Sequence, residues 1–221
     1  INNCNFTDNG RNHGREGGAI WLRAAELHID NSLFYRNNAS SHGGAIYISD
    51  NSYNNIYINN TIFEENGQSV NNRGGAIVKW ETNNNGNYLD YPDTLFINNS
   101  QFIANGGGAV DQGGAIALYR SDAVINNSLF VRNSDDLSRG AIHMNHDTGN
   151  SNEETPYHYF EMNFCTVAHN RYNCTSCDDS HGIGFEGDWV NANINNSIYN
   201  SDGSNQYGIV GDIGANYTNV W

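Results

Sequence analysis

The chain is poor in basic residues and has no long apolar run. Lysine and arginine together number 10, against 24 aspartate and glutamate residues, and the formal net charge is −14 over 221 residues. Such an acidic surface repels phosphate backbones, so nucleic acid is not an expected partner. No window of about 18 consecutive apolar residues occurs, so no membrane-spanning helix is predicted.

A secretion signal is also missing. The first residues, Ile1–Cys4, contain no charged segment followed by an apolar one. They fall instead within a repeated sequence element. We therefore expect the chain to be a piece of a longer protein, with its export signal and anchor elsewhere.

Proline is nearly absent, with two copies, whereas asparagine is the most abundant residue. High asparagine content and low charge density can indicate disorder. However, aromatic residues make up 12% of the chain, and the phenylalanines and isoleucines keep a regular spacing from the asparagines. This regular spacing predicts a folded chain.

Two short elements recur in fixed order. One is Asn-Asn followed by Phe-x-x-Asn, as in residues 59–66, and the other is Gly-Gly-Ala-Ile, as in residues 74–77. Self-similarity with a period of about 20–50 residues indicates a stacked repeat architecture. The first element has Phe-x-x-Asn at 6–9, 34–37, 63–66, 102–105 and 130–133, and in eroded form at 167–170. The second element lies at 17–20, 43–46, 74–77 and 113–116, and weakens at 139–142.

Each repeat predicts three short strands: one before the Asn pair, one containing the Phe, and one after the glycines. Alternation such as Ile56/Ile58 or Ile46/Ile48 is typical of strands. A short strand cannot bury its apolar side alone, so successive repeats must stack, each strand pairing in parallel with its own copy. We therefore predict one all-β domain over residues 1–221, a right-handed parallel β-helix of about seven rungs. The repeats are regular over residues 1–142 and degenerate, with insertions, over 143–221.

The asparagines and glycines follow from this architecture. Asparagine tolerates the left-handed backbone of a tight corner, and its amide can hydrogen-bond to the equivalent amide one repeat away. The second Asn of each pair is therefore predicted to form a structural ladder: Asn31, Asn60, Asn99, Asn127 and Asn196. Paired glycines fit where the chain turns sharply and another backbone comes close.

Insertions occur at one place in the repeat. Residues 80–93, 145–158 and 50–55 all lie between the glycine-led strand and the strand before the Asn pair. Loops that leave the same corner of successive repeats cluster on one side of a solenoid. That side is the expected location of specific contacts.

The paired elements, Gly-Gly-Ala-Ile and Phe-x-x-Asn, resemble the repeats of the chlamydial polymorphic outer-membrane proteins and of related bacterial and protist surface proteins. The resemblance covers residues 1–142 well. It implies an exported β-helical protein, extracellular or at the cell surface, involved in adhesion. It implies no catalytic residue and no cofactor, because the shared motifs are structural.

Two of the four cysteines occupy the same repeat position, which otherwise holds serine or threonine. Cys4 and Cys165 are five repeats apart, which at the spacing of neighbouring strands is roughly 24 Å. A disulfide requires Cα atoms within about 7 Å, so these two cannot pair with each other. They are interpreted as small packed thiols.

The other two cysteines, Cys174 and Cys177, lie in an insertion, where a local disulfide is the expectation for a secreted protein. A redox site would need a βαβ context that the sequence lacks. A zinc site would need two further ligands, and only His169 and His181 are near in sequence. No metal site is predicted.

Eight N-glycosylation sequons occur. Those at Asn59, Asn98, Asn126 and Asn195 belong to the repeat itself, so they arise either by chance from the ladder or as a line of glycans along one edge. Asn38, Asn173 and Asn216 are predicted to lie in loops and are the stronger candidates; Asn5 completes the set.

Aromatic residues recur in the glycine-led strands. Trp21 and Tyr47 share one position, and Trp80 and Tyr119 lie two residues further along their strands. Alternation turns Trp21 and Tyr47 outward. They are interpreted either as packing between repeats or as an exposed contact stripe for sugar rings or another subunit.

Catalysis has one weak signal. Residues 178–182, Asp-Asp-Ser-His-Gly, resemble pieces of the acidic and Gly-His-Gly elements of pectin hydrolases. In those enzymes the acids come from neighbouring rungs, and two carboxylates must stand a defined distance apart. Here the acids are contiguous, as they are at 135–136 and 153–154, and no basic element follows. We therefore predict no catalytic residues.

The expected function is that of an extracellular or cell-surface structural or adhesive scaffold, including that of a glycosylated subunit of a filament or stalk. Copies of the chain stacked head to tail, or other surface proteins, are the expected partners. The alternative is a carbohydrate-binding or polysaccharide-cleaving β-helix, which would require acidic side chains from adjacent repeats to converge.

Overall fold

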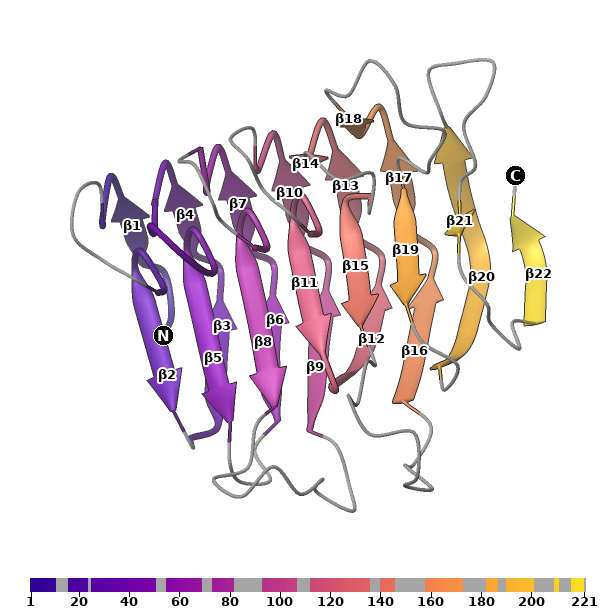
Figure 1. The fold of residues 1–221 in the computed structure, drawn as a ribbon, viewed down its shortest axis with the longest axis horizontal. Coiled ribbons are helices and arrows are strands. Elements are labelled where there is room, and N and C mark those ends of the chain that lie inside the picture. Colours follow the sequence, from indigo (N-terminus) through magenta and orange to yellow (C-terminus); the bar gives the residue numbers. More distant parts are fainter. Residues whose placement is uncertain are drawn as a thin grey trace.

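Of the 221 residues, the computed structural model describes 1–10, 16–23, 25–50, 55–68, 73–81, 93–106, 112–135, 140–145, 158–172, 182–186, 190–200, 209–210 and 216–220. These residues form strands and the connections between them, and none of them is helical. The strands lie in parallel rows, with the two ends of the chain at opposite ends of the array (Figure 1). The predicted all-β class is therefore confirmed.

The strands fall into three sets that recur in the same order. The Gly strands, which follow the glycine pairs, are β2 (Ile20–Arg23), β5 (Ile46–Asp50), β8 (Ile77–Glu81), β11 (Ile116–Tyr119), β15 (Ile142–Asn145), β19 (Ile183–Glu186) and β21 (Ile209–Val210). The Ile strands, which precede the Asn pairs, are β3 (Leu27–Asp30), β6 (Ile56–Asn59), β9 (Thr94–Asn98), β12 (Asp122–Asn126), β16 (His158–Asn163), the first part of β20 (Val190–Asn200) and β22 (Asn216–Val220). The Phe strands are β1 (Asn5–Thr7), β4 (Leu33–Tyr35), β7 (Ile62–Glu64), β10 (Gln101–Ile103), β13 (Leu129–Val131), β17 (Thr166–Ala168) and the second part of β20.

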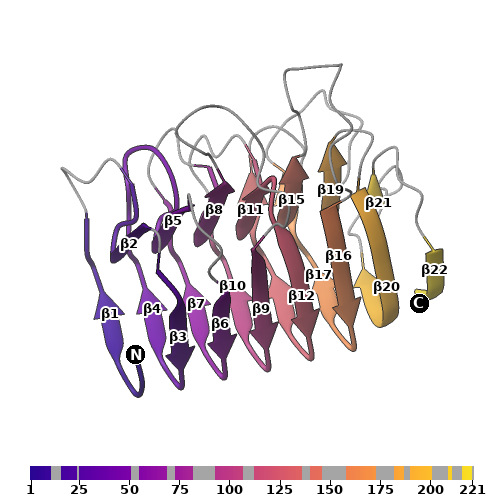
Figure 2. The same ribbon diagram turned by 90° about the horizontal axis from the view of Figure 1, so that it is seen from below.

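Each strand pairs in parallel with the strand of its own set in the next repeat. The Gly strands form one sheet, and the long strand β20 joins the Ile and Phe strands into another. Figure 2 shows the Ile and Phe strands of successive repeats side by side. A short extra pair, β14 (Ser134–Asp135) with β18 (Arg171–Tyr172), is also parallel. The arrangement is consistent with a parallel β-helix.

The register brings identical sequence positions into contact. Phe34 pairs with both Phe6 and Phe63, and the stack continues through Phe102 and Phe130 with ring centroids 4.7–4.9 Å apart. Together with the inward residues of the other strands, the Phe side chains form one continuous core. This burial of regular apolar positions drives the repeats to stack.

An inward position of β8 departs from the apolar rule. Lys79 of β8 lies between Ile48 and Leu118 in register and is fully buried. Its Nζ donates to Ser121 Oγ at 3.3 Å. Burial of a lysine requires such hydrogen bonding, because an unpaired buried ammonium is strongly unfavourable.

The two glycines of each pair meet different backbone requirements, a left-handed conformation and a close approach to the next repeat, as predicted. The first glycine of a pair, such as Gly43 with φ 60°, adopts the left-handed backbone. The second lies against the next repeat: a Cβ on Gly44 would come within 2.1 Å of Gly75 O. Only glycine meets either requirement without strain.

The second Asn of each pair adopts the predicted left-handed corner, with φ between 46° and 51° at Asn31, Asn60, Asn99 and Asn127. In this column, however, the side-chain bonds among described residues join only Asn127 to Asn99, at 2.7 Å, and Asn31 to Asn2, at 3.3 Å. The continuous ladders lie elsewhere, so the predicted position of the ladder requires correction. The corner residues point to solvent, where an amide has no need of an amide partner.

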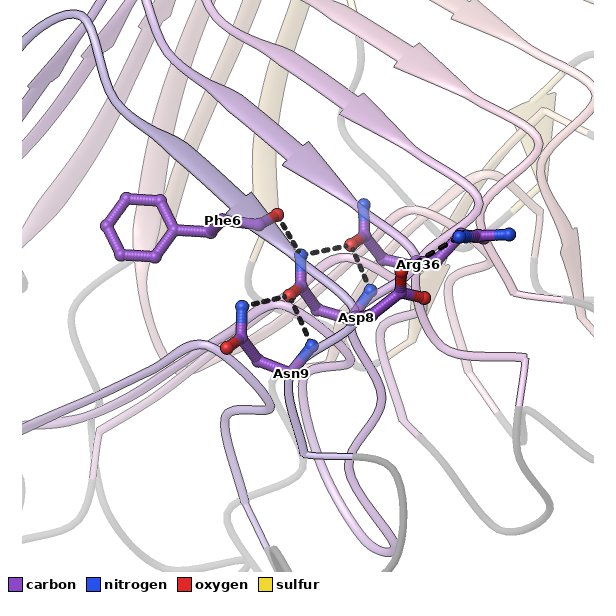
Figure 3. A network of polar contacts seen from close by, with 6 residues as sticks. Phe6, Asp8, Asn9 and Arg36 are labelled. Carbon is purple, nitrogen blue, oxygen red and sulfur yellow. Dashed lines mark hydrogen bonds and ion pairs between the residues drawn. The ribbon is translucent and has the colours of Figure 1, made fainter.

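The buried ladder is made by the Asn of Phe-x-x-Asn. The Nδ2 group of each donates to the Oδ1 atom of the next, at 2.8–3.0 Å, from Asn9 through Asn37, Asn66, Asn105 and Asn133 to Asn170. The same oxygens accept backbone N–H groups, and the second amide hydrogen reaches a Phe carbonyl of the preceding repeat. Figure 3 shows the first step around Phe6 and Asn9, beside an ion pair of Arg36 with Asp8 at 2.8 Å.

A third column carries hydroxyls and the two aligned cysteines. Backbone N–H groups donate to Ser, Thr or Cys side chains of the next repeat, from Cys4 to Ser197. Cys4 and Cys165 are free thiols, and burial raises the pKa of Cys165 to about 11. They are packed thiols, as predicted. Cys174 and Cys177 lie outside the described residues, as do most residues of the insertions.

Candidate functional surfaces

The sequon asparagines of the repeat form a second ladder, on the outer face of the Ile strands. Each ends its strand, except Asn195 within the long strand β20, is half-buried, and donates from Nδ2 to the side-chain oxygen of the preceding repeat. The bonds measure 2.9–3.1 Å and run from Asp30 through Asn59, Asn98, Asn126 and Asn163 to Asn195. The atom to which a glycan attaches is thus already engaged along the ladder. The place of Asn163 in this ladder was not predicted, because Phe164 follows it and no Asn pair marks the position.

The other glycosylation candidates lie in different settings. Asn5 is exposed at the start of β1. Asn38 follows β4 outside any strand, is half-buried, and its backbone N–H donates to Asn9 O at 2.9 Å. Asn216 begins β22 and so does not lie in a loop as expected. Asn173 is outside the described residues.

A polar cluster joins β12 and β16 on the same outer face, together with His158, which is buried. Asp122 Oδ1 lies 3.2 Å from His158 Nδ1 and accepts the Tyr159 backbone N–H at 2.9 Å. The Tyr159 hydroxyl donates to Glu161, whose other oxygen accepts Asn163 Nδ2 at 2.6 Å. Register places Asp122 opposite Tyr159, so the two carboxylates come from neighbouring strands. Acids from neighbouring strands are one part of what the polysaccharide-cleaving alternative requires.

The hydrogen bonding of Glu161 limits the role that this residue could take in that chemistry. The bond from Tyr159, and then that from Asn163, lower the pKa of the Glu161 carboxyl, and the same bond raises the pKa of Tyr159. Glycoside hydrolysis needs one carboxylic acid that remains protonated to act as proton donor. The lowered pKa favours the ionised form of Glu161, which does not suit the role of proton donor. The acids at 136, 153–154 and 178–179 lie outside the described residues.

The four residues of the predicted aromatic stripe differ in exposure. Trp21 is 53% exposed, and its Nε1 donates to Glu16 at 3.1 Å. Tyr47 and Tyr119 are only 8% and 7% exposed, and Trp80 stacks on Tyr119 with ring centroids 4.4 Å apart. Tyr47 aligns with Val78 rather than with Trp80. Packing between repeats therefore describes three of the four residues, and Trp21 alone is exposed.

These residues belong to a second apolar cluster on the outer face of the Gly strands, here called the outer cluster. It consists of Tyr47, Val78, Trp80, Ala117 and Tyr119.

A different aromatic stack went unnoticed in the sequence. His28, Tyr57 and Phe96 occupy the outward position between the inward isoleucines of β3, β6 and β9, with ring centroids 4.6 and 5.1 Å apart. The only available signal was this shared position in the alternation. Because the ring faces are turned toward one another, they leave edges rather than faces for a sugar ring.

A polar column borders the outer cluster. Glu16, His42, Arg73 and Gln112 form successive parallel bridges just before the glycine pairs. The His42 ring lies 5.7 Å from that of Tyr47 and 5.5 Å from that of Trp80. Burial, and then the charge of Arg73, lower the pKa of His42, while Glu16 opposes the shift.

The lowered pKa of His42 predicts a pH dependence of stability. The folded state favours the neutral ring, so unfolding takes up a proton once the pH falls below the unfolded value of about 6.5. The free energy of unfolding should therefore fall in acid by more in the native chain than in His42→Gln. Thermal unfolding of both from about pH 8 to about pH 5 measures this difference. Parallel pH profiles for the two proteins would contradict the assignment.

The described residues contain no group of three or more His, Cys, Asp or Glu side chains placed to hold a metal ion. Within the same residues, no helix is long and apolar enough to cross a membrane.

Comparison of the chain with models of protein families, with curated proteins and with solved structures found no match.

Proposed function

We propose that the chain is a right-handed parallel β-helix of about seven rungs with three strands each, and that it serves as an extracellular or cell-surface structural and adhesive scaffold. The observation that carries this proposal is the continuity of its side-chain ladders. The buried amide ladder runs from Asn9 to Asn170 without a break, and the Phe stack accompanies it. Such periodicity supports a rigid rod rather than a single reactive site.

The rod has a direction. At every step of the buried ladder the amide of one Asn donates to the oxygen of the next Asn along the chain. Further rungs can extend the ladder only in the same orientation, whether they belong to the same polypeptide or to another copy. Head-to-tail stacking of copies into a filament or stalk is the assembly that this geometry supports.

The resemblance to surface-protein repeats supports the location and the adhesive role, with copies of the chain or other surface proteins as partners. The acidic composition supports a solvated outer surface. Glycosylation at the sequons is part of the proposal, with exposed Asn5 the most accessible of those whose side chains are described.

Electron microscopy of the purified chain over a range of concentrations tests the scaffold role, with intact-mass analysis for glycans. We expect unbranched rods, and an increase of rod length with concentration would identify head-to-tail stacking. Compact particles would overturn the scaffold proposal. Release of reducing ends from a polysaccharide panel would instead support the cleaving alternative, and substitution of Glu161 by Gln would then have to abolish that release.

A further inference from the structure

Arg73 has no acidic partner among the described residues. Its guanidinium makes no hydrogen bond or ion pair with any described residue, and lies over the rings of Trp80 and Tyr119 at 5.5 and 5.7 Å. Arg36, by contrast, bonds Asp8 at 2.8 Å. In a chain with 24 acidic and 10 basic residues, a guanidinium without a carboxylate leaves its donors available for another molecule.

The aromatic residues hold Arg73 in place. Trp80 and Tyr119 stack on each other at 4.4 Å and occupy paired positions of β8 and β11. The guanidinium is therefore supported by two adjacent strands, while Arg73 itself is only half-buried. Stacking of arginine on aromatic faces fixes its planar set of donors and leaves their edges available for a ligand.

Uncharged hydrogen-bonding groups flank Arg73 on both sides. Gln112, in the next repeat, is 8% exposed, and its Oε1 has no donor. His42, in the preceding repeat, has a buried Nδ1 without a partner. Buried polar atoms without partners are uncommon and indicate a missing ligand or water. The only carboxylate in the column, Glu16, bonds Trp21 and lies two repeats from Arg73.

We propose that Arg73, together with His42, Gln112 and the Trp80–Tyr119 stack, binds an acidic sugar residue of a polysaccharide through its carboxylate or sulfate group. The guanidinium recognises the oxyanion with two parallel hydrogen bonds. The sugar hydroxyls supply donors for Gln112 Oε1 and a partner for His42 Nδ1. This binding activity goes beyond the scaffold role and does not depend on it.

Binding to the full chain can be followed by Trp fluorescence and calorimetry at about 0.15 M salt. The probes are an oligogalacturonate, which carries carboxylates, a heparin-derived oligosaccharide, which carries sulfates as well, and a neutral cello-oligosaccharide. We expect saturable binding of an acidic probe and none of the neutral one. Binding of the oligogalacturonate would identify the carboxylate as sufficient, whereas binding of the heparin fragment alone would identify the sulfate ester.

Variants locate the site. Arg73→Gln should weaken binding of the acidic probe by about tenfold or more, since charge-assisted hydrogen bonds are lost. Arg132→Gln removes the same charge from an exposed arginine and should leave affinity unchanged, provided that circular dichroism shows both variants folded. The proposal would be overturned if Arg73→Gln bound the acidic probe as tightly as the native chain does. Failure of both acidic probes to bind would also overturn it, as would binding of inorganic sulfate as tight as that of the oligosaccharide.

Discussion

Substitution of Gly75 by alanine is expected to prevent stable folding. The added Cβ would lie 2.0 Å from Gly114 O and 2.3 Å from Gly106 N. Both neighbours are backbone atoms of the next repeat, and Gly106 N is itself bonded to Asn66 O at 2.8 Å. Relief of the contact would require a shift of one repeat against another, which breaks ladders on both sides. We expect destabilisation of more than about 4 kcal/mol, among the largest effects of a single substitution.

Far-UV circular dichroism, thermal unfolding and protease resistance measure this effect. Ala104→Gly is the matched comparison because it makes the reverse change at a residue with φ 51° that is half-buried. There the loss of the methyl group relieves left-handed strain, partly offset by greater freedom of the unfolded chain, so the melting temperature should stay level or rise slightly. A soluble Gly75→Ala protein that melts within a few degrees of the native chain would show that the close approach of repeats is not required.

The roles of the paired glycines were predictable because they depend on the backbone alone. A Gly-Gly pair at the start of the Gly strand in four repeats, as at Gly43 and Gly74, predicts both the left-handed turn and the close approach without reference to other side chains. The left-handed asparagine corner was predictable for the same reason. Parallel stacking followed from the alternation of apolar residues, whose inward positions the structure buries.

The position of the buried amide ladder was not predictable. Three columns carry Asn in nearly every repeat, and only one of them, which includes Asn99, has the left-handed backbone. Which column forms the buried ladder depends on the direction of the side chain: Asn105 turns inward and is fully buried, whereas Asn99 turns outward. Composition cannot distinguish these columns, because the same residue type serves each.

The outer surfaces were predicted least well. Alternation correctly turned Tyr47 outward from the core, but outward is not equivalent to exposed, and Tyr47 is buried in the outer cluster. The Arg73 column gave no signal at all, since its members are Glu, His, Arg and Gln. A site whose residues differ in type from one repeat to the next leaves no periodic trace in the sequence.

Replacement of Asn105 by aspartate should show how much the buried ladder contributes. Asn105 is fully buried; its Nδ2 donates to Phe63 O and Asn133 Oδ1, each at 2.9 Å. A carboxylate would face both acceptors without a donor, while still accepting from Asn66. A buried charge that faces unpaired acceptors costs about 3–5 kcal/mol, which corresponds to a fall in melting temperature of about 10 °C for a chain of this size.

Asn60→Asp supplies the control for charge, since it introduces the same carboxylate at an exposed asparagine. It should change stability by no more than about 0.5 kcal/mol. The two variants should also differ in pH dependence. Burial beside acceptors raises the folded-state pKa of the new carboxyl at position 105, so its destabilising effect is smallest below the unfolded value of about 3.9 and grows as pH rises through the folded-state value. In acid the protonated group can restore one of the two lost donors. Equal melting temperatures for the two variants across this pH range would mean that the amide ladder is a consequence of stacking rather than a source of its stability.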